Sequence, residues 1–109
     1  MNTGWTPYAG TDYLHWDAVE SWCRATAAAH PDWVRLDVVG DSLQGRPLLL
    51  LTLTAPGDDR KRPGFWLDGG THAAEWTGVM AALYSVSKWV ERIDTDPDFR
   101  GWLADHAIY

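Results

Sequence analysis

The sequence predicts an α/β protein in which helices cover a central sheet. Apolar residues recur with helical spacing in two long segments, alternate with polar residues at 33–40, and run almost without interruption through LLLLTLT at 48–54. Strand patterns interleaved with helix patterns are typical of layered α/β folds. The 109 residues, 46% of them hydrophobic, suffice for one small core but not for two domains.

The first predicted helix spans Trp16–Ala29. Val19 and Cys23 fall near helical spacing within it, alanines favour helix at its end, and the His30-Pro31 step stops it. The alternation at 33–40 then predicts a strand with one wetter face.

Two further strands and their turns come next. Gly40 and Gly45 supply turn conformations before the apolar run at 48–54, which is typical of a strand buried on both faces. After a polar loop, FWLDGG at 65–70 predicts a third, short strand that ends at glycines.

The apolar period changes at Trp76 and predicts a helix of about five turns that reaches Ile93. Asp96 is the expected N-cap of another helix, with Pro97 at its first position. HAIY at 106–109 resembles the beginning of a further strand, so we expect the sheet within this chain to be incomplete.

Charge and composition exclude several classes of protein. The formal net charge is -6, and the only cluster of cations is Arg60–Arg62, which argues against nucleic acid as a partner. No apolar run is long enough to span a membrane. The N-terminus shows no signal-peptide pattern and Cys23 is the only cysteine, which favours the cytoplasm over secretion.

The stretch DGGTHAAEW at 68–76 contains a candidate metal site. His72 and Glu75 stand three residues apart, just after a predicted strand and two glycines, where sites form in open α/β sheets. Imidazole nitrogen and carboxylate oxygen both suit Zn²⁺. The bare spacing is not specific, because it arises by chance in roughly one chain in ten of this composition. A glutamate at the start of a helix is also favoured by the helix dipole without any metal.

The surrounding residues resemble the zinc carboxypeptidases, the M14 metallopeptidase family, whose signature is DGGIHAREW. An upstream G-x-S-x-x-G-R-P pattern of the family is matched by Gly40, Ser42, Gly45, Arg46 and Pro47. The resemblance runs with consistent spacing from about Tyr13 to Tyr109. Two motifs in the right order and at the right distance are more specific than either alone.

The resemblance implies a three-layer α/β/α fold with a mixed central sheet, of the phosphorylase/hydrolase-like, zinc-peptidase type, of which residues 1–109 would form the N-terminal part. It implies a zinc cofactor with His72 as the first ligand and Glu75 as the second. Carboxypeptidase A, a member of this family, is the standard example of a two-histidine, one-glutamate zinc site. The third ligand, the general base and the substrate-binding residues would lie beyond Tyr109.

The implied activity is hydrolysis of C-terminal peptide bonds, in which zinc polarises the scissile carbonyl and a carboxylate accepts a proton from water. We therefore expect the isolated chain to be inactive. One departure from the family pattern is Ala74, where the family has an arginine beside the substrate. Three alternatives remain open: a zinc-dependent deacylase of small N-acyl amino acids, a non-catalytic binding relative, and an α/β domain without metal.

Four other residues have expected roles. Asp68 is expected to structure its loop rather than orient a ligand histidine. Trp76 is expected to be the first buried residue of its helix, beneath the site. We expect Cys23 to be a small buried hydrophobe and His106 to be a surface histidine at a helix C-terminus.

Overall fold

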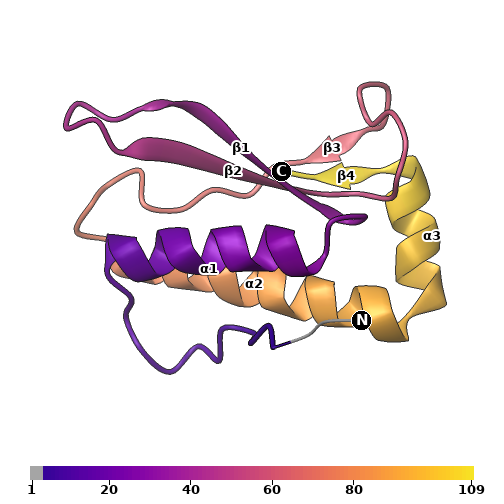
Figure 1. Ribbon diagram of the computed structural model, residues 1–109, viewed down its shortest axis with the longest axis horizontal. Coiled ribbons are helices and arrows are strands. Elements are labelled where there is room, and N and C mark those ends of the chain that lie inside the picture. The colour runs from indigo at the N-terminus through magenta and orange to yellow at the C-terminus, as the bar shows by residue number, and fades with distance from the viewer. Residues whose placement is uncertain (1–3) are drawn as a thin grey trace.

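A computed structural model describes residues 4–109 and contains three helices and four strands (Figure 1). In chain order, the elements are α1 Trp16–Ala29, β1 Val34–Asp41, β2 Pro47–Leu53, β3 Gly64–Phe65, α2 Trp76–Thr95, α3 Pro97–Asp105 and β4 Ala107–Ile108. No helix in this part of the chain is long and apolar enough to cross a membrane.

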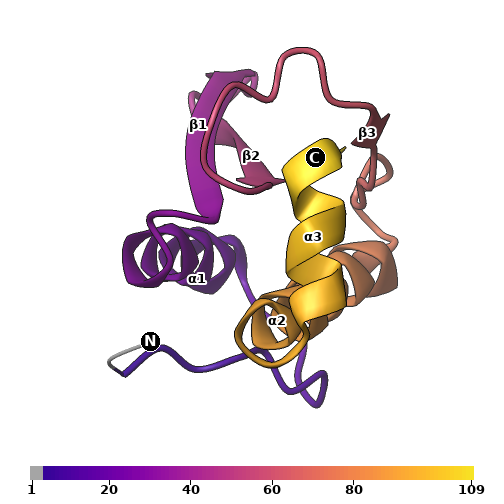
Figure 2. The same ribbon diagram turned by 90° about the vertical axis from the view of Figure 1, so that its right-hand side faces the viewer.

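The four strands form one mixed sheet in the order β1-β2-β4-β3. β1 pairs antiparallel with β2, β2 pairs antiparallel with β4, and β3 pairs parallel with β4. Both α1 and α2 lie against the same face of the sheet, while α3 rises from the end of α2 toward β4 (Figures 1 and 2). The predicted α/β class with a mixed sheet is confirmed, and residues 4–109 supply the sheet with one helical layer.

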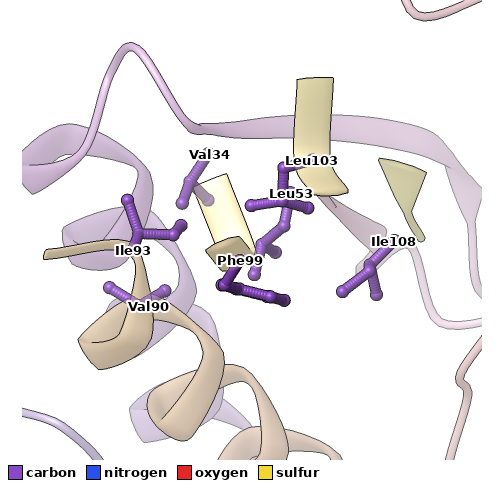
Figure 3. Close-up of a cluster of buried hydrophobic side chains, with 7 residues drawn as sticks. All are labelled: Val34, Leu53, Val90, Ile93, Phe99, Leu103 and Ile108. Atoms are coloured by element: carbon purple, nitrogen blue, oxygen red, sulfur yellow. The ribbon is translucent and has the colours of Figure 1, made fainter. Parts of the chain in front are cut away.

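Two clusters of buried side chains fill the space between the sheet and the helices. The first joins α2 and α3 to β1, β2 and β4, and Figure 3 shows its members: Val34, Leu53, Val90, Ile93, Phe99, Leu103 and Ile108. The second joins α1 to α2 and consists of Tyr8, Val19, Cys23, Met80 and Leu83. The first cluster fixes the short strand β4 at the centre of the sheet.

Local signals set the helix boundaries where they were expected. α1 has the predicted bounds, and α2 and α3 meet at Asp96. The Asp96 carboxylate accepts hydrogen bonds from the backbone N–H groups of Asp98 and Phe99, at 3.0 and 3.2 Å, and Pro97 is the first residue of α3. An N-cap followed by proline therefore turns the chain from α2 into α3.

Two strand predictions are corrected by the structure. Only Phe65 of the predicted third strand, 65–70, belongs to β3, because the chain passes into an irregular loop after Leu67. β2 is not buried on both faces along its length: Leu53 is 1% exposed, whereas Leu48 is 48% exposed. The reason is that α1 and α2 cover the same face of the sheet.

The segment before α1 is held against the helices by side-chain contacts. The Trp5 indole donates to the Thr26 hydroxyl at 2.9 Å, and the Tyr8 backbone N–H donates to the Ser87 hydroxyl at 2.8 Å. Farther along, Tyr13 stacks edge-on against Trp76. The N-terminal segment therefore reaches the start of α2, next to the candidate metal site.

Candidate metal centre

The loop that carries the candidate ligands begins at the edge of the sheet. After β3, the backbone N–H of Leu67 donates to the carbonyl of Tyr109 at 2.8 Å, so the chain still follows β4 at this point. It then leaves through Gly69 and Gly70 and enters α2 at Trp76. The candidate site thus lies beyond the end of a strand and at the start of a helix, as the sequence predicts.

Gly69 and Gly70 place the loop directly against α2. A β-carbon on Gly69 would lie 2.4 Å from the carbonyl oxygen of Gly78, and one on Gly70 would lie 2.6 Å from Val79 Cγ2. Gly70 also has a φ of +84°, in the left-handed region that glycine adopts without strain. No larger residue at position 69 or 70 would let the loop lie this close to the helix.

Gly78 is the helix side of this contact, and the sequence analysis did not identify it. Its own β-carbon position would meet Gly69 Cα at 3.6 Å, an ordinary contact distance. A glycine inside a helix is less favourable than alanine. Its presence in the predicted helix was therefore the sequence signal that another backbone segment packs closely at this position.

His72 and Glu75 converge within one tight turn. The Glu75 backbone N–H donates to the His72 carbonyl at 2.9 Å, and His72 Nδ1 lies 3.0 Å from Glu75 Oε1. The two side chains are 77% and 70% exposed, so nothing shields them from solvent or from a ligand. Glu75 is the N-cap residue of α2, which agrees with its predicted place at the start of the helix.

This pair fits two positions around one zinc ion. Two ligand atoms at zinc distances of about 2.0–2.2 Å and a tetrahedral angle lie about 3.3–3.6 Å apart. The observed Nδ1–Oε1 separation is 3.0 Å, a hydrogen-bond distance, so the two atoms would move apart by about 0.3–0.6 Å to hold one zinc ion. No group of three or more potential metal ligands occurs among residues 4–109. The described chain therefore offers two donors for a zinc ion.

A family model for zinc carboxypeptidases (peptidase M14) matches residues 19–109. The chain belongs to the zinc carboxypeptidase family. It is 33% identical over 88 residues to carboxypeptidase B of Astacus astacus, a match that covers 81% of this chain and 28% of the relative. It is 29% identical over 93 residues to carboxypeptidase A1 of Bos taurus, covering 85% of this chain and 22% of that protein.

A further relative is the inactive metallocarboxypeptidase ecm14 of Schizosaccharomyces pombe, 29% identical over 109 residues, covering 94% of this chain and 22% of that protein. The fold is shared with thrombin activatable fibrinolysis inhibitor, with a TM-score of 0.77 at 23% identity, over 94% of this chain and 26% of that structure. The chain thus spans between about a fifth and just over a quarter of the length of the curated relatives it matches.

Asp68 structures the loop, as expected. Its carboxylate accepts hydrogen bonds from the Trp66 indole at 2.5 Å and from the Thr71 hydroxyl at 3.4 Å, both within the same segment. The prediction for Trp76 is wrong, because its side chain is 43% exposed and stacks edge-on against Tyr13 and His15. The Trp76 ring therefore packs on the segment before α1 at the surface, a contact that the helical period does not report.

Cys23 and His106 lie apart from the candidate site and have local roles. Cys23 is buried between α1 and α2, and this burial raises the pKa of its thiol to about 11, so it is not an activated nucleophile. His106 caps the C-terminus of α3, where its ring stacks on Trp102 and its Nδ1 lies 3.0 Å from the Trp102 carbonyl. Both expectations are confirmed.

Proposed function

We propose that this chain is part of a zinc-dependent metallocarboxypeptidase that hydrolyses C-terminal peptide bonds. The observation that carries the proposal is the His72–Glu75 pair in a member of this family. The two candidate metal-binding atoms, His72 Nδ1 and Glu75 Oε1, lie 3.0 Å apart on a loop that Gly69 and Gly70 hold against α2. His72 and Glu75 would be two of the protein ligands. By the family pattern, a third ligand and the general base would come from residues beyond Tyr109.

Each nearby residue has a defined task in this proposal. Gly69 and Gly70 hold the loop against α2, and Asp68 restrains the loop from the strand side. The exposure of both ligand side chains leaves room for further ligands and for a substrate carbonyl. Zinc, when bound, would polarise the scissile carbonyl and make water a stronger acid.

Zinc titration of the chain by calorimetry tests the ligand assignment. We expect weak binding of one zinc ion, because two protein donors hold the ion less tightly than three or four. His72→Ala and Glu75→Ala should each weaken binding at least about tenfold, since each removes half of the protein donors.

Matched controls for this titration are His106→Ala and Glu91→Ala, which remove the same residue types far from the loop. His106 stacks on Trp102, and Glu91 pairs with Lys88 on α2. Neither control should change the zinc affinity. If His72→Ala and Glu75→Ala bound zinc as tightly as the unaltered chain, the proposed ligands would be wrong.

Ala74 favours a second candidate, a deacylase that acts on small N-acyl amino acids. Ala74 is exposed between the two proposed ligands, and its methyl group can neither donate a hydrogen bond nor carry a charge. In a protein that also carries the third ligand, Ala74→Arg should shift the ratio of kcat/KM values toward peptides and leave the zinc content unchanged. An unchanged ratio would remove the support for this candidate.

A non-catalytic relative is the third candidate, and the inactive metallocarboxypeptidase of Schizosaccharomyces pombe is an example of such a relative. Retention of His72 and Glu75 argues against it here. Stoichiometric zinc without any hydrolysis, in a protein with all three ligands, would favour it.

A further inference from the structure

Residues 5–15, which we call the N-terminal strap, run along one face of α2 in the direction opposite to that of the helix (Figure 1). The backbone N–H of Tyr8 donates to the Ser87 hydroxyl at 2.8 Å. Farther along the strap, the backbone N–H of Leu14 donates to Met80 Sδ at 3.4 Å. The helix residues that the strap meets lie on one stripe of α2 with helical spacing: Thr77, Met80, Tyr84 and Ser87.

The N-terminal strap ends on the first turn of α2. The Tyr13 ring packs edge-on against Trp76, with ring centroids 5.9 Å apart, and its hydroxyl lies 3.3 Å from Thr77 Oγ1. His15 packs edge-on against the same indole, also at 5.9 Å. Trp76 and Thr77 directly follow Glu75, the proposed second zinc ligand. The strap therefore packs on the helical turn that begins at a proposed ligand.

This first turn lacks the side-chain cap that often holds the start of a helix. Glu75 is the N-cap residue of α2, but its side chain makes no capping hydrogen bond and lies against His72 instead. The first N–H groups of a helix have no partner within it, so an uncapped first turn opens more easily than the helix interior. Because the Glu75 carboxylate is turned toward His72, the restraint on this turn must come from another part of the chain.

We propose that Tyr13 of the N-terminal strap is a positioning residue for the zinc ligand Glu75, an inference that rests on the proposed function. The Tyr13 ring packs on Trp76 and holds the first turn of α2 closed. The closed turn keeps Glu75 Oε1 within 3.0 Å of His72 Nδ1, so that both side chains can reach one zinc ion. Tyr13 acts through the helical turn and is not itself a ligand.

Hydrogen exchange without metal tests whether Tyr13 holds this turn. The Glu75 N–H donates to the His72 carbonyl at 2.9 Å, and the Gly78 N–H donates to the Glu75 carbonyl at 3.2 Å. In Tyr13→Leu, both amides should exchange roughly three- to tenfold faster, the factor expected from the loss of one aromatic pair. In Tyr13→Phe, which retains the ring, exchange should stay within about twofold, because the lost 3.3 Å hydroxyl contact is long for a hydrogen bond.

Zinc titration tests whether Tyr13 acts through Glu75, in a protein that also carries the third ligand. Tyr13→Leu should raise the dissociation constant for zinc at least about threefold, because apparent affinity falls with the fraction of molecules in which the turn is closed. In a protein that already contains Glu75→Ala, Tyr13→Leu should have no further effect. A general loss of stability would instead act in both backgrounds alike.

Ser87→Ala is the matched control for loosening the N-terminal strap. It removes the acceptor of the Tyr8 N–H at the other end of the strap, and Ser87 lies about 18 Å along the axis of α2 from Glu75, at about 1.5 Å per residue. This variant should change the dissociation constant for zinc, and the exchange of the Glu75 and Gly78 amides, less than about twofold.

Unchanged exchange of these two amides in Tyr13→Leu would overturn the proposal, as would an equal loss of zinc affinity with and without Glu75. If Tyr13→Leu failed to fold, Trp76→Leu, which removes the other ring of the pair, should give the same faster exchange and the same dependence on Glu75. A protein that bound no zinc would refute the proposed function, whereas faster exchange in the variant would still show that Tyr13 holds the turn.

Discussion

At the scale of single residues, Asp59 connects three parts of the sheet. It is buried in the loop between β2 and β3, where its carboxylate accepts a hydrogen bond from the Tyr109 hydroxyl at 2.7 Å and one from the Arg35 guanidinium at 3.3 Å. The hydrogen bond from Tyr109 has the larger effect and the one from Arg35 the smaller, and together they hold the pKa of the Asp59 carboxyl below its ordinary value. The loop is thereby tied to β1 and to the end of β4.

Loss of the Tyr109 hydroxyl should destabilise the fold. Tyr109→Phe removes the hydrogen bond to Asp59 and should lower the free energy of unfolding at pH 6 by about 1 kcal/mol, the usual net value of one such bond. Urea denaturation measures this change. An unaltered free energy would mean that water replaces the hydroxyl at no cost.

The contribution of Asp59 should depend on pH in a defined direction. Because its pKa is lower in the folded chain than in the unfolded chain, Asp59 stabilises the fold above the unfolded value of about 3.9 and loses this effect as the pH falls through the folded value. The difference in unfolding free energy between the unaltered chain and Asp59→Asn should therefore be larger at pH 6 than at pH 3.

Asp58→Asn is the matched control, because Asp58 is the exposed neighbour of Asp59 and pairs with Arg60 at the surface. Arg60 also lowers the pKa of Asp58, but solvent screens this exposed pair, so Asp58→Asn should change the stability and its pH dependence less than Asp59→Asn does. A difference between the unaltered chain and Asp59→Asn that did not narrow at pH 3 would contradict the assigned direction of the pKa shift.

Sequence could predict the residue-scale features that depend on near neighbours along the chain. The spacing of His72 and Glu75 placed their side chains together, and Asp96 was identified as a cap from the proline that follows it. The contact between Asp59 and Tyr109 joins residues 50 positions apart, so no local pattern reports it. The packing of Trp76 also depends on a distant segment, because its ring contacts Tyr13.

At the scale of elements, the metal-site loop and α2 are held together by a close contact between two glycines, Gly69 in the loop and Gly78 in the helix. Gly69 lies against the backbone of Gly78, so the position of the loop is set by the helix that begins at its end. The same two glycines explain why 65–70 does not form a full strand: the chain must leave the sheet to reach the helix. The strand pattern of the sequence does not contain this requirement.

Gly69→Ala should separate the loop from α2. Its β-carbon would need to move the Gly78 carbonyl, which lies 2.4 Å away, so we expect a loss of about 1–3 kcal/mol in the free energy of unfolding and weaker zinc binding. Thermal denaturation and zinc titration measure the two effects.

Gly101→Ala provides the control for an added methyl group. Gly101 lies in α3 with open space at its β-carbon position, so alanine should stabilise the chain by about 0.5–1 kcal/mol and leave zinc binding unchanged. If both variants had the same effect, the close approach of Gly69 to Gly78 would not position the loop.

At the scale of the whole molecule, the described chain is a sheet with helices on one face and substantial apolar surface left exposed. The fold class could be predicted from the sequence, because helices and strands have different apolar periods. The strand order could not be predicted, because no local pattern specifies that β4 lies between β2 and β3. Among the exposed side chains are Val39 and Leu43 at the far end of the β1–β2 hairpin, 64% and 105% exposed.

This surface should make the 109-residue chain self-associate, and the association should increase with salt. A net charge of -6 keeps copies apart at low ionic strength, and salt screens that repulsion while apolar contacts persist. Size-exclusion chromatography with light scattering at low and high salt measures the effect.

Leu43→Lys should reduce association at high salt because it removes exposed apolar area, whereas Gln44→Lys, the same added charge on the same turn, should reduce it much less. Equal effects of the two variants would show that charge, rather than apolar surface, controls association, and a monodisperse monomer at both salt concentrations would show that the exposed surface does not mediate association at all.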